Sequence, residues 1–263
     1  MGSFLKSLAA AGLLLALATG EARAEIKIGL ASEPFPPFFV KDASGKWGGW
    51  EIDALNAVCK AMNETCDFVE VAWDGIIPAL QAKNIDVIWA AMSINEDRRK
   101  VISFSDPYYA TTLAVAGQKG SGASADYQSL KGKRVGVQVS TVSEKYAQKF
   151  YVPAGAEILT YQTQDEAHQD LVAGRVDAAI GSAGLILEFL RTDSGKSCCE
   201  FVASLPYDEI LGDGVGAGLR KEDEALREKL NAGIKEAAES GELAKLAKNY
   251  PGLSDVIVIY PKK

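Results

Sequence analysis

Two stretches of the chain repeat one short pattern, and this repeat constrains the fold more than any other feature of the sequence. LQAKNIDVIWAA begins at Leu80 and LVAGRVDAAIGS begins at Leu171, so both contain L-x-A-x-x-[I/V]-D followed by an apolar segment. Each predicts the end of a helix, a turn and a strand. The repeat has two interpretations: a coincidence of common α/β turns, or two similar lobes whose matching strands end at Ala90-Ala91 and Gly181-Ser182.

The rest of the chain alternates in the same way. Short β-branched runs predict strands at 26–31, 68–72, 86–91, 134–139, 157–162 and 177–181, and helical periodicity appears at 52–62, 141–151, 164–174 and 221–250, the last as two helices parted near Ser240-Gly241. This order predicts an α/β fold with mostly parallel sheets flanked by helices. Ligands of open α/β sheets bind beyond the carboxyl ends of the strands. Two such ends facing each other would form a ligand cleft.

The first 24 residues predict a secretory signal peptide. Lys6 precedes the apolar run LAAAGLLLALATG, and Ala22-Arg23-Ala24 resembles a cleavage site, so the mature protein is expected to begin at Glu25. The alternative is a membrane anchor, but the 13-residue run falls short of the roughly 20 residues that cross a bilayer. The next cysteine is Cys59, so no lipid-attachment cysteine follows the run. We expect an exported, unanchored, periplasmic protein.

Composition excludes several classes of function. Cleavage would change the net charge from −7 to −8 and leave 239 residues, enough for one or two domains. An acidic surface argues against nucleic acid and anionic membranes as partners. In an oxidising compartment Cys59 and Cys66 can form a disulfide, which would stabilise the fold by roughly 2.5 kcal/mol. Cys198 and Cys199 are adjacent and could form a vicinal bond or stay reduced.

Arg98 is the principal candidate for binding an anion. It follows the predicted strand at 86–91, and Ser93 lies in the same loop. A guanidinium can hold a carboxylate with two parallel hydrogen bonds, although a solvated arginine beside acidic neighbours is the alternative. A second anion contact is expected where a strand runs into Ser140-Thr141, because Glu144 follows Thr141 by three residues as in a capping box. The N–H groups at such a helix start are free.

Aromatic and acidic residues could form the cleft walls. Phe35 and Trp73 could sandwich an aliphatic or cationic side chain, and Glu33 could pair with a distal cation. Taken alone, each aromatic residue is better explained as core and Glu33 as surface. His168 is the only histidine and lies in the polar run QDEAHQD, which favours a solvated helix face. A catalytic triad or a histidine-rich metal site is therefore excluded. The sequence has no GxGxxG or phosphate-binding loop, and we expect no metal and no cofactor.

In these residues and in several longer stretches, the chain resembles the periplasmic solute-binding proteins of polar amino-acid ABC importers, including the lysine/arginine/ornithine and histidine binders. The resemblance is carried by IGLASEPFPPF, MSINEDRRKVISFSDPYY, LKGKRVGVQVST, LVAGRVDAAI and GDGVGAGLRKED, in the family's order along nearly the whole mature chain. It implies a two-lobed type II binding-protein fold with lobe 1 at 25–111 and 212–263 and lobe 2 at 112–211. It also implies closure around the ligand, delivery to an inner-membrane permease, a monomeric state and a Cys59–Cys66 disulfide.

The resemblance assigns roles to residues of the cleft. It implies that Arg98 binds the α-carboxylate with help from Ser93 and a backbone N–H near Val142. Phe35 and Trp73 would sandwich the ligand side chain, and a carbonyl near Ala91 would take the α-ammonium. The predicted ligand site comprises Glu33, Phe35, Trp73, Ala90, Ala91, Ser93, Arg98, Gln138, Thr141, Val142 and Ser182.

The chain departs from the family at the expected ammonium site. Family members usually carry an aspartate where this chain has Ser182, and serines where it has Ala90 and Ala91. A hydroxyl cannot neutralise a buried ammonium, so either an acid such as Glu33 compensates or the ligand nitrogen is substituted or absent. The expected function is therefore capture of a polar, basic amino acid or a derivative. The alternatives are an opine binder and an enzyme similar to the periplasmic cyclohexadienyl dehydratases.

Overall fold

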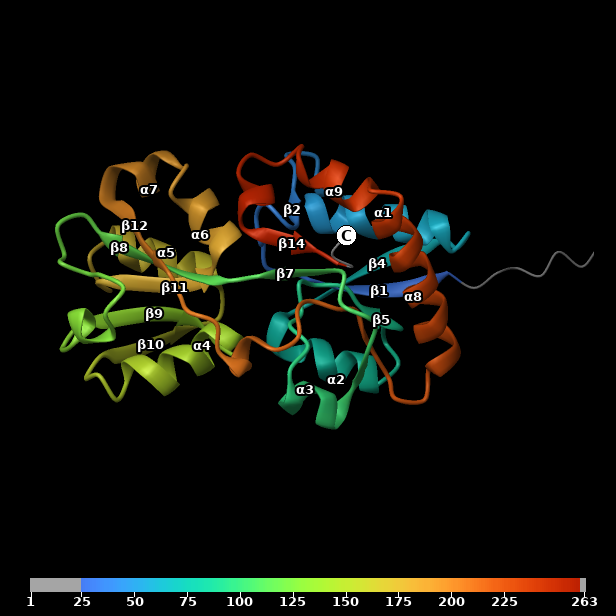
Figure 1. The fold of residues 1–263 in the computed structure, drawn as a ribbon, viewed down its shortest axis with the longest axis horizontal. Coiled ribbons are helices and arrows are strands. Elements are labelled where there is room, and N and C mark those ends of the chain that lie inside the picture. Colours follow the sequence, from blue (N-terminus) through green and yellow to red (C-terminus); the bar gives the residue numbers. More distant parts are fainter. Residues whose placement is uncertain (1–24, 261–263) are drawn as a thin grey trace, which may run out of the picture.

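The computed structural model describes residues 25–260, which form two five-stranded sheets with helices packed on their faces (Figure 1). The first sheet has the order β4 (Cys66–Val71), β1 (Ile26–Ala31), β5 (Val87–Ile88), β13 (Gly218–Leu219) and β6 (Ser103–Phe104). The second has the order β10 (Glu157–Tyr161), β9 (Arg134–Gln138), β11 (Ala178–Ser182), β8 (Leu113–Gln118) and β12 (Cys199–Ser204).

Within each described sheet, a single strand runs against the others. β1 is parallel to β4 and β5, whereas β13 is antiparallel to both β5 and β6. In the second sheet, β9 is parallel to β10 and β11, and β8 is antiparallel to β11 and β12. The prediction of mostly parallel sheets is confirmed, and the reversed strand occupies the same place in both.

The sequence repeat marks equivalent elements of the two sheets. The stretch from Leu80 contains the end of α2 (Ile76–Gln81) and then β5, and the stretch from Leu171 contains the end of α5 (Gln164–Val172) and then β11. β5 and β11 are each the third strand of their sheet. The interpretation as two similar lobes is confirmed, and both strand ends lie at the carboxyl edge where open sheets bind ligands.

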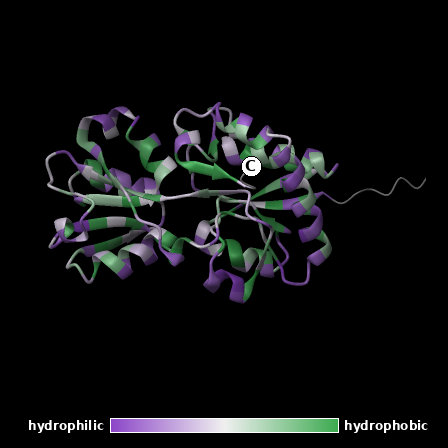
Figure 2. Cartoon of the chain, in the orientation of Figure 1, coloured by the Kyte–Doolittle hydropathy of each residue, from purple (hydrophilic) through white to green (hydrophobic). Residues whose placement is uncertain are grey.

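The helices cover the sheets, and all of them except α3 bury residues against the core. They are α1 (Trp50–Ala61), α2, α3 (Glu96–Val101), α4 (Val142–Tyr146), α5, α6 (Ala183–Phe189), α7 (Asp193–Cys198), α8 (Glu224–Glu239) and α9 (Glu242–Ala247). A π-helical turn, Ala147–Tyr151, extends α4, and β2 (Val40–Lys41) forms a small hairpin with β3 (Trp47–Gly48). α8 and α9 separate at Gly241, whose φ of 81° is left-handed, as the sequence predicts. In Figure 2 the apolar residues concentrate on the strands and inner helix faces.

Close packing of α8 on α1 depends on a glycine. A Cβ atom at Gly233 would lie 2.7 Å from Met62 Cγ and 3.1 Å from the Val58 carbonyl oxygen. The first distance is shorter than real Cβ contacts and the second is tight, so Gly233 lets the two helices approach. The apolar face of α1, including Ile52 and Leu55, is buried in the same core.

Two segments join the sheets. The chain leaves the first sheet through β7 (Tyr109–Thr111), which pairs with β14 (Ile257–Ile259), and it returns through the segment 205–215 (Figure 1). The lobe boundaries after 111 and 211 stay a prediction. Directly before β7 in the chain, the Tyr108 hydroxyl donates to both oxygens of the fully buried Glu51, at 3.0 and 2.7 Å.

The structure joins the cysteines in two pairs. Cys59 at the end of α1 bonds to Cys66 at the start of β4, with Cα atoms 6.4 Å apart, which confirms the expected disulfide. Cys198 and Cys199 are bonded to each other, the first of the two alternatives that the sequence leaves open. Residues 25–260 contain no helix long and apolar enough to cross a membrane. The expected signal peptide lies outside the described residues.

Candidate ligand-binding site

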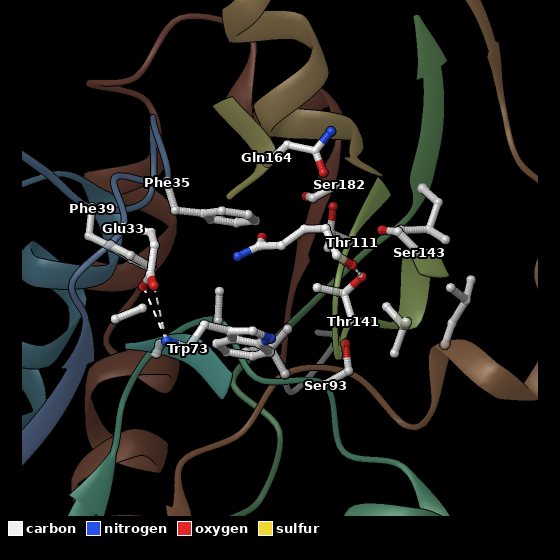
Figure 3. Close-up of a pocket in the computed structure, with 18 of the residues that line it drawn as sticks. Glu33, Phe35, Phe39, Trp73, Ser93, Thr111, Thr141, Ser143, Gln164 and Ser182 are labelled. Carbon is white, nitrogen blue, oxygen red and sulfur yellow. Dashed lines mark hydrogen bonds between the residues drawn. The ribbon is translucent and has the colours of Figure 1, made fainter. Parts of the chain in front are cut away.

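One cavity between the sheets is lined by all eleven residues of the predicted site. They come from the loop after β5 and from α3, from the segments before α1 and α2, and from the ends of β9 and β11 and the start of α4. Six polar or aromatic residues of the described lining were not predicted: Phe39, Tyr109, Thr111, Thr112, Ser143 and Gln164. Figure 3 shows side chains from both lobes converging on this cavity.

Arg98 is held in the cavity by contacts on both sides. The side chain of Asn95 caps α3 and accepts from the Arg98 N–H at 3.0 Å, which fixes the start of the helix. One terminal guanidinium nitrogen donates to the Ser93 carbonyl at 2.9 Å. The other donates to the Ser140 carbonyl, in the opposite lobe, at 3.2 Å. Desolvation lowers the pKa of Arg98 to about 10, so the side chain stays cationic at neutral pH.

Trp73 links the arginine to Glu33, the one acid among the described lining residues. The Arg98 guanidinium lies over the Trp73 ring, 5.3 Å from its centroid, and the indole N–H donates to the Ser140 carbonyl at 3.3 Å. The backbone N–H of Trp73 donates to the two carboxylate oxygens of Glu33 at 3.3 and 3.2 Å. Figure 3 shows Phe35 reaching into the same space from the other side. The two aromatic side chains and the carboxylate therefore line the same cavity, with Phe35 and Trp73 on opposite sides.

Ser140 brings lobe 2 into direct contact with lobe 1. Its φ of 61° is left-handed, an uncommon conformation for a residue with a side chain, and its carbonyl accepts from both Arg98 and Trp73. Thr141 accepts from the Glu144 N–H at 3.2 Å, as expected for an N-cap. The Glu144 carboxylate, however, accepts from the N–H of Ser140 rather than of Thr141, so the predicted capping box is displaced by one residue.

An ion pair also crosses between the lobes. Asp97 on α3 pairs with Lys145 on α4 at 2.5 Å and with Lys100 on its own helix at 2.8 Å. Hydrogen bonds from Lys100 and Lys145 lower the pKa of Asp97 to about 2. Because these groups are exposed, the pairing is sensitive to salt.

The prediction that His168 is solvated is wrong. Its ring is 4% exposed and stacks on Phe189 with centroids 4.1 Å apart. Gln164, Ala167, His168 and Leu171 form the buried face of α5. They recur at helical spacing, so one face of the helix formed by the polar run QDEAHQD is buried. Burial lowers the pKa of His168 to about 3, which keeps the imidazole neutral.

Gln164 and Ser182 line the lobe 2 side of the cavity. Gln164 is 5% exposed, and its amide nitrogen lies 3.3 Å from His168 Nε2. The Ser182 hydroxyl oxygen is buried and has no hydrogen-bond partner among residues 25–260. The helical spacing of α5 was the available signal for Gln164, whereas Thr111 and Ser143 follow from lobe packing that no local pattern encodes.

The charged groups of the cavity lining are one cation and one anion. Arg98 is the cation and Glu33 the anion among the described lining residues. Residues 25–260 contain no group of three or more histidine, cysteine, aspartate or glutamate side chains that could hold a metal ion. The arrangement therefore suits a ligand that carries a carboxylate and a separate cation.

Sequence and structure comparisons give one consistent result. The family model of bacterial extracellular solute-binding proteins, family 3, matches residues 26–253. The histidine-binding periplasmic protein of Salmonella typhimurium is 40% identical over 85% of this chain and 87% of its own. The L-arginine-binding protein of Pseudomonas aeruginosa is 36% identical over 94% of this chain and 96% of its own. An ancestral arginine-binding protein bound to arginine superposes with a TM-score of 0.79 at 34% identity, covering 88% of this chain and 99% of the other.

Proposed function

Because this chain belongs to family 3 of the bacterial extracellular solute-binding proteins, we propose that it captures a basic amino acid or amino-acid derivative and delivers it to an inner-membrane ABC permease. The ligand class is proposed because relatives with histidine- and arginine-binding names align over most of the chain. The observation that carries the proposal is the position of Arg98, a cation held between two lobes in an otherwise mostly apolar cavity.

Arg98 would bind the ligand carboxylate. A guanidinium has five N–H donors, and contacts with Ser93 and Ser140 use one on each terminal nitrogen. The remaining donors suffice for a bidentate grip on a carboxylate. The Ser93 hydroxyl and the backbone N–H groups at Thr141-Val142 would complete the carboxylate contacts from the two lobes.

The aliphatic part of the ligand would lie between Phe35 and Trp73. Its distal cation would meet the Glu33 carboxylate, which is held beside Trp73. Cations over aromatic faces are stabilised by about 0.5 to 2 kcal/mol. The small residues Ala90 and Ala91 leave room at the strand end, and a backbone carbonyl near Ala91 would accept from the ligand nitrogen.

The lobes, taken as residues 25–111 with 212–263 and residues 112–211, would close around this ligand. A ligand shifts the population toward the closed state only by binding it more tightly than the open state. Contacts to both Arg98 and lobe 2 would provide that difference. The mature protein would begin at Glu25, after removal of the signal peptide, and act as a periplasmic monomer.

A thermal-shift screen of ligand-stripped protein tests the proposal. The panel contains arginine, ornithine, lysine, histidine, glutamine and opines. A ligand at 100 times its dissociation constant adds about 2.7 kcal/mol to the free energy of unfolding, which raises Tm by roughly 5 to 10 °C at this size. A shift with at least one of these compounds is expected, and no shift across the panel would contradict the proposal.

We propose a binding protein and not an enzyme. The relatives that cover most of the chain are binding proteins. A dehydratase would need a general acid or base within reach of the substrate, and Glu33 would have to supply it while accepting from the Trp73 N–H. Turnover of prephenate or arogenate by the purified protein would contradict this assignment.

A further inference from the structure

We infer that Ser182 and Gln164, with His168 behind them, form an uncharged subsite that selects ligands whose α-nitrogen is substituted. This inference rests on the proposed function, because it assumes that Arg98 holds the ligand carboxylate. The substituent is either an acyl group, which makes the nitrogen uncharged, or a carboxyalkyl group, whose carboxylate balances the charge of the nitrogen. In both cases the substituted nitrogen brings no net charge to lobe 2.

The Gln164 amide has a defined orientation. Its nitrogen lies 3.3 Å from His168 Nε2, and in Figure 3 its oxygen points toward Ser182. Because the buried imidazole is neutral, one ring nitrogen is an acceptor. With Nε2 as that acceptor, the amide N–H donates to His168. The amide oxygen is then left to accept an N–H from a ligand.

Two neighbours complete the subsite. Gly181 lies beneath the amide, since a Cβ atom there would approach the Gln164 Cδ to 3.2 Å. Because Gly181 has no side chain, the Gln164 amide can occupy this space. The Ser182 hydroxyl is buried without a partner among the described residues, and a buried polar group without a partner is costly. A ligand group that bonds Ser182 would remove that cost.

The charges of the cavity favour a substituted nitrogen. Arg98 can pair with a carboxylate, and Glu33 can pair with a distal cation. No described lining residue offers a second carboxylate, so a free α-ammonium would face only neutral acceptors. Burying a charge against neutral groups costs free energy unless an opposite charge lies near it. The small side chains of Ala90, Ala91 and Ser182, from both lobes, leave space for the substituent.

The experiment compares ligands that differ only at the α-nitrogen. Dissociation constants for L-arginine, Nα-acetyl-L-arginine and octopine would be measured by calorimetry on the mature protein. We expect at least one substituted ligand to bind ten-fold or more tightly than arginine, and the tighter of the two identifies the substituent. Arginine binding as tightly as both would overturn the inference and leave the proposed function intact. Binding of none of the three would overturn the inference, and silence of the whole thermal-shift panel as well would overturn the proposed function.

Variants of the subsite test its mechanism. Ser182→Asp and Gln164→Glu each add a carboxylate beside the ligand nitrogen. Each should raise the ratio of the affinity for arginine to the affinity for the better substituted ligand at least ten-fold. The matched control is Gln169→Glu, because Gln169 lies on the exposed side of the same helix. The control should leave the ratio of the two affinities unchanged. An equal change in the control would contradict a local effect at the subsite.

His168 is a positioning residue in this account. His168→Phe keeps an aromatic ring against Phe189 but removes the acceptor for Gln164, so the amide can rotate. The ratio of affinities for substituted and free arginine should fall about three-fold or more, while Tm without ligand defines any general loss of stability. His168→Gln restores an acceptor and should recover part of the ratio. A lower Tm with an unchanged ratio would assign His168 a purely structural role.

Discussion

Glu51 is a fully buried acid beneath the strand that joins the lobes. Trp89 donates to its backbone carbonyl at 3.0 Å, and Trp89 stacks on Tyr108, whose hydroxyl donates to the carboxylate. Burial raises the pKa of Glu51 to about 7, although the Tyr108 hydrogen bond acts in the opposite direction. The folded protein therefore holds this proton more tightly than the unfolded chain.

The sign of the resulting pH dependence is fixed by this difference. Because the folded pKa is raised, the stability contribution is complete below pH 4.5 and is lost as the pH rises through 7. Glu51→Gln keeps an acceptor for Tyr108. It should remove a loss in the free energy of unfolding, on the order of 3 kcal/mol, that accompanies the rise in pH. Urea unfolding at pH 5, 6, 7 and 8 measures the effect. Equal pH slopes for the wild type and the variant would contradict it.

The charged and aromatic residues of the site could be predicted from the sequence, but their partners could not. Arg98 follows the end of a predicted strand, where open α/β sheets bind ligands. Its guanidinium can therefore be recognised from the local sequence as a candidate contact for a carboxylate. The contact from Arg98 to the Ser140 carbonyl joins residues 42 positions apart, and it depends on a left-handed backbone conformation at Ser140. The buried position of His168 follows from its helical spacing with Gln164, Ala167 and Leu171 and not from the polarity of the run around it.

At the scale of elements, α3 and α4 face each other across the cleft. Asp97 is shared between Lys100, on its own helix, and Lys145, on the opposite lobe. The two ion pairs therefore differ in whether they join the lobes. The first pair persists whenever α3 is folded, and the second forms only when the lobes are close.

Lys145→Met should weaken ligand binding, because it removes a contact present only between closed lobes. For an exposed pair we expect a two- to five-fold loss of affinity, and less at high salt. The matched control is Lys100→Met, which removes a partner of the same carboxylate but leaves the contact between lobes. Calorimetric titrations at 20 mM and 500 mM NaCl distinguish the two variants, because screening of charges grows strongly over about this range. Equal losses in both variants would exclude a role in closure.

The Cys59–Cys66 disulfide ties the end of α1 to β4. Replacing both cysteines by serine should lower the free energy of unfolding by about 2.5 kcal/mol, as the chain-entropy treatment of a short loop predicts. Ligand affinity should change little, because neither cysteine lines the cavity. Urea unfolding and calorimetry check the two statements. A large loss of affinity with unchanged stability would contradict them.

For the whole molecule, the repeat of helix, turn and strand indicated two similar lobes as one of two interpretations, the other being coincidence. The strand order of each sheet and the reversed strand were not predicted, since β13 returns to the first sheet from a segment more than 100 residues beyond β6. Local periodicity carries no information on such pairings. The resemblance to a known family supplied the two-lobed arrangement that periodicity alone left open.

Closure should be measurable as a change in molecular size. The lobes are joined through β7 and the segment 205–215 and meet through Arg98, Trp73 and Ser140. Small-angle scattering should report a smaller radius of gyration with ligand than without it. An unchanged radius, with binding shown by calorimetry, would contradict a ligand-driven closure.

The central claim is that Arg98 captures a ligand carboxylate between the lobes. Its most direct test is a calorimetric titration of the wild type, Arg98→Lys and Arg98→Ala with the tightest ligand of the thermal-shift panel. We expect Arg98→Ala to lose about 2 to 5 kcal/mol of binding free energy, which is roughly 30-fold or more in affinity. Arg98→Lys should lose less, since it keeps the charge but not the bidentate geometry. Unchanged affinity in Arg98→Ala would contradict the account.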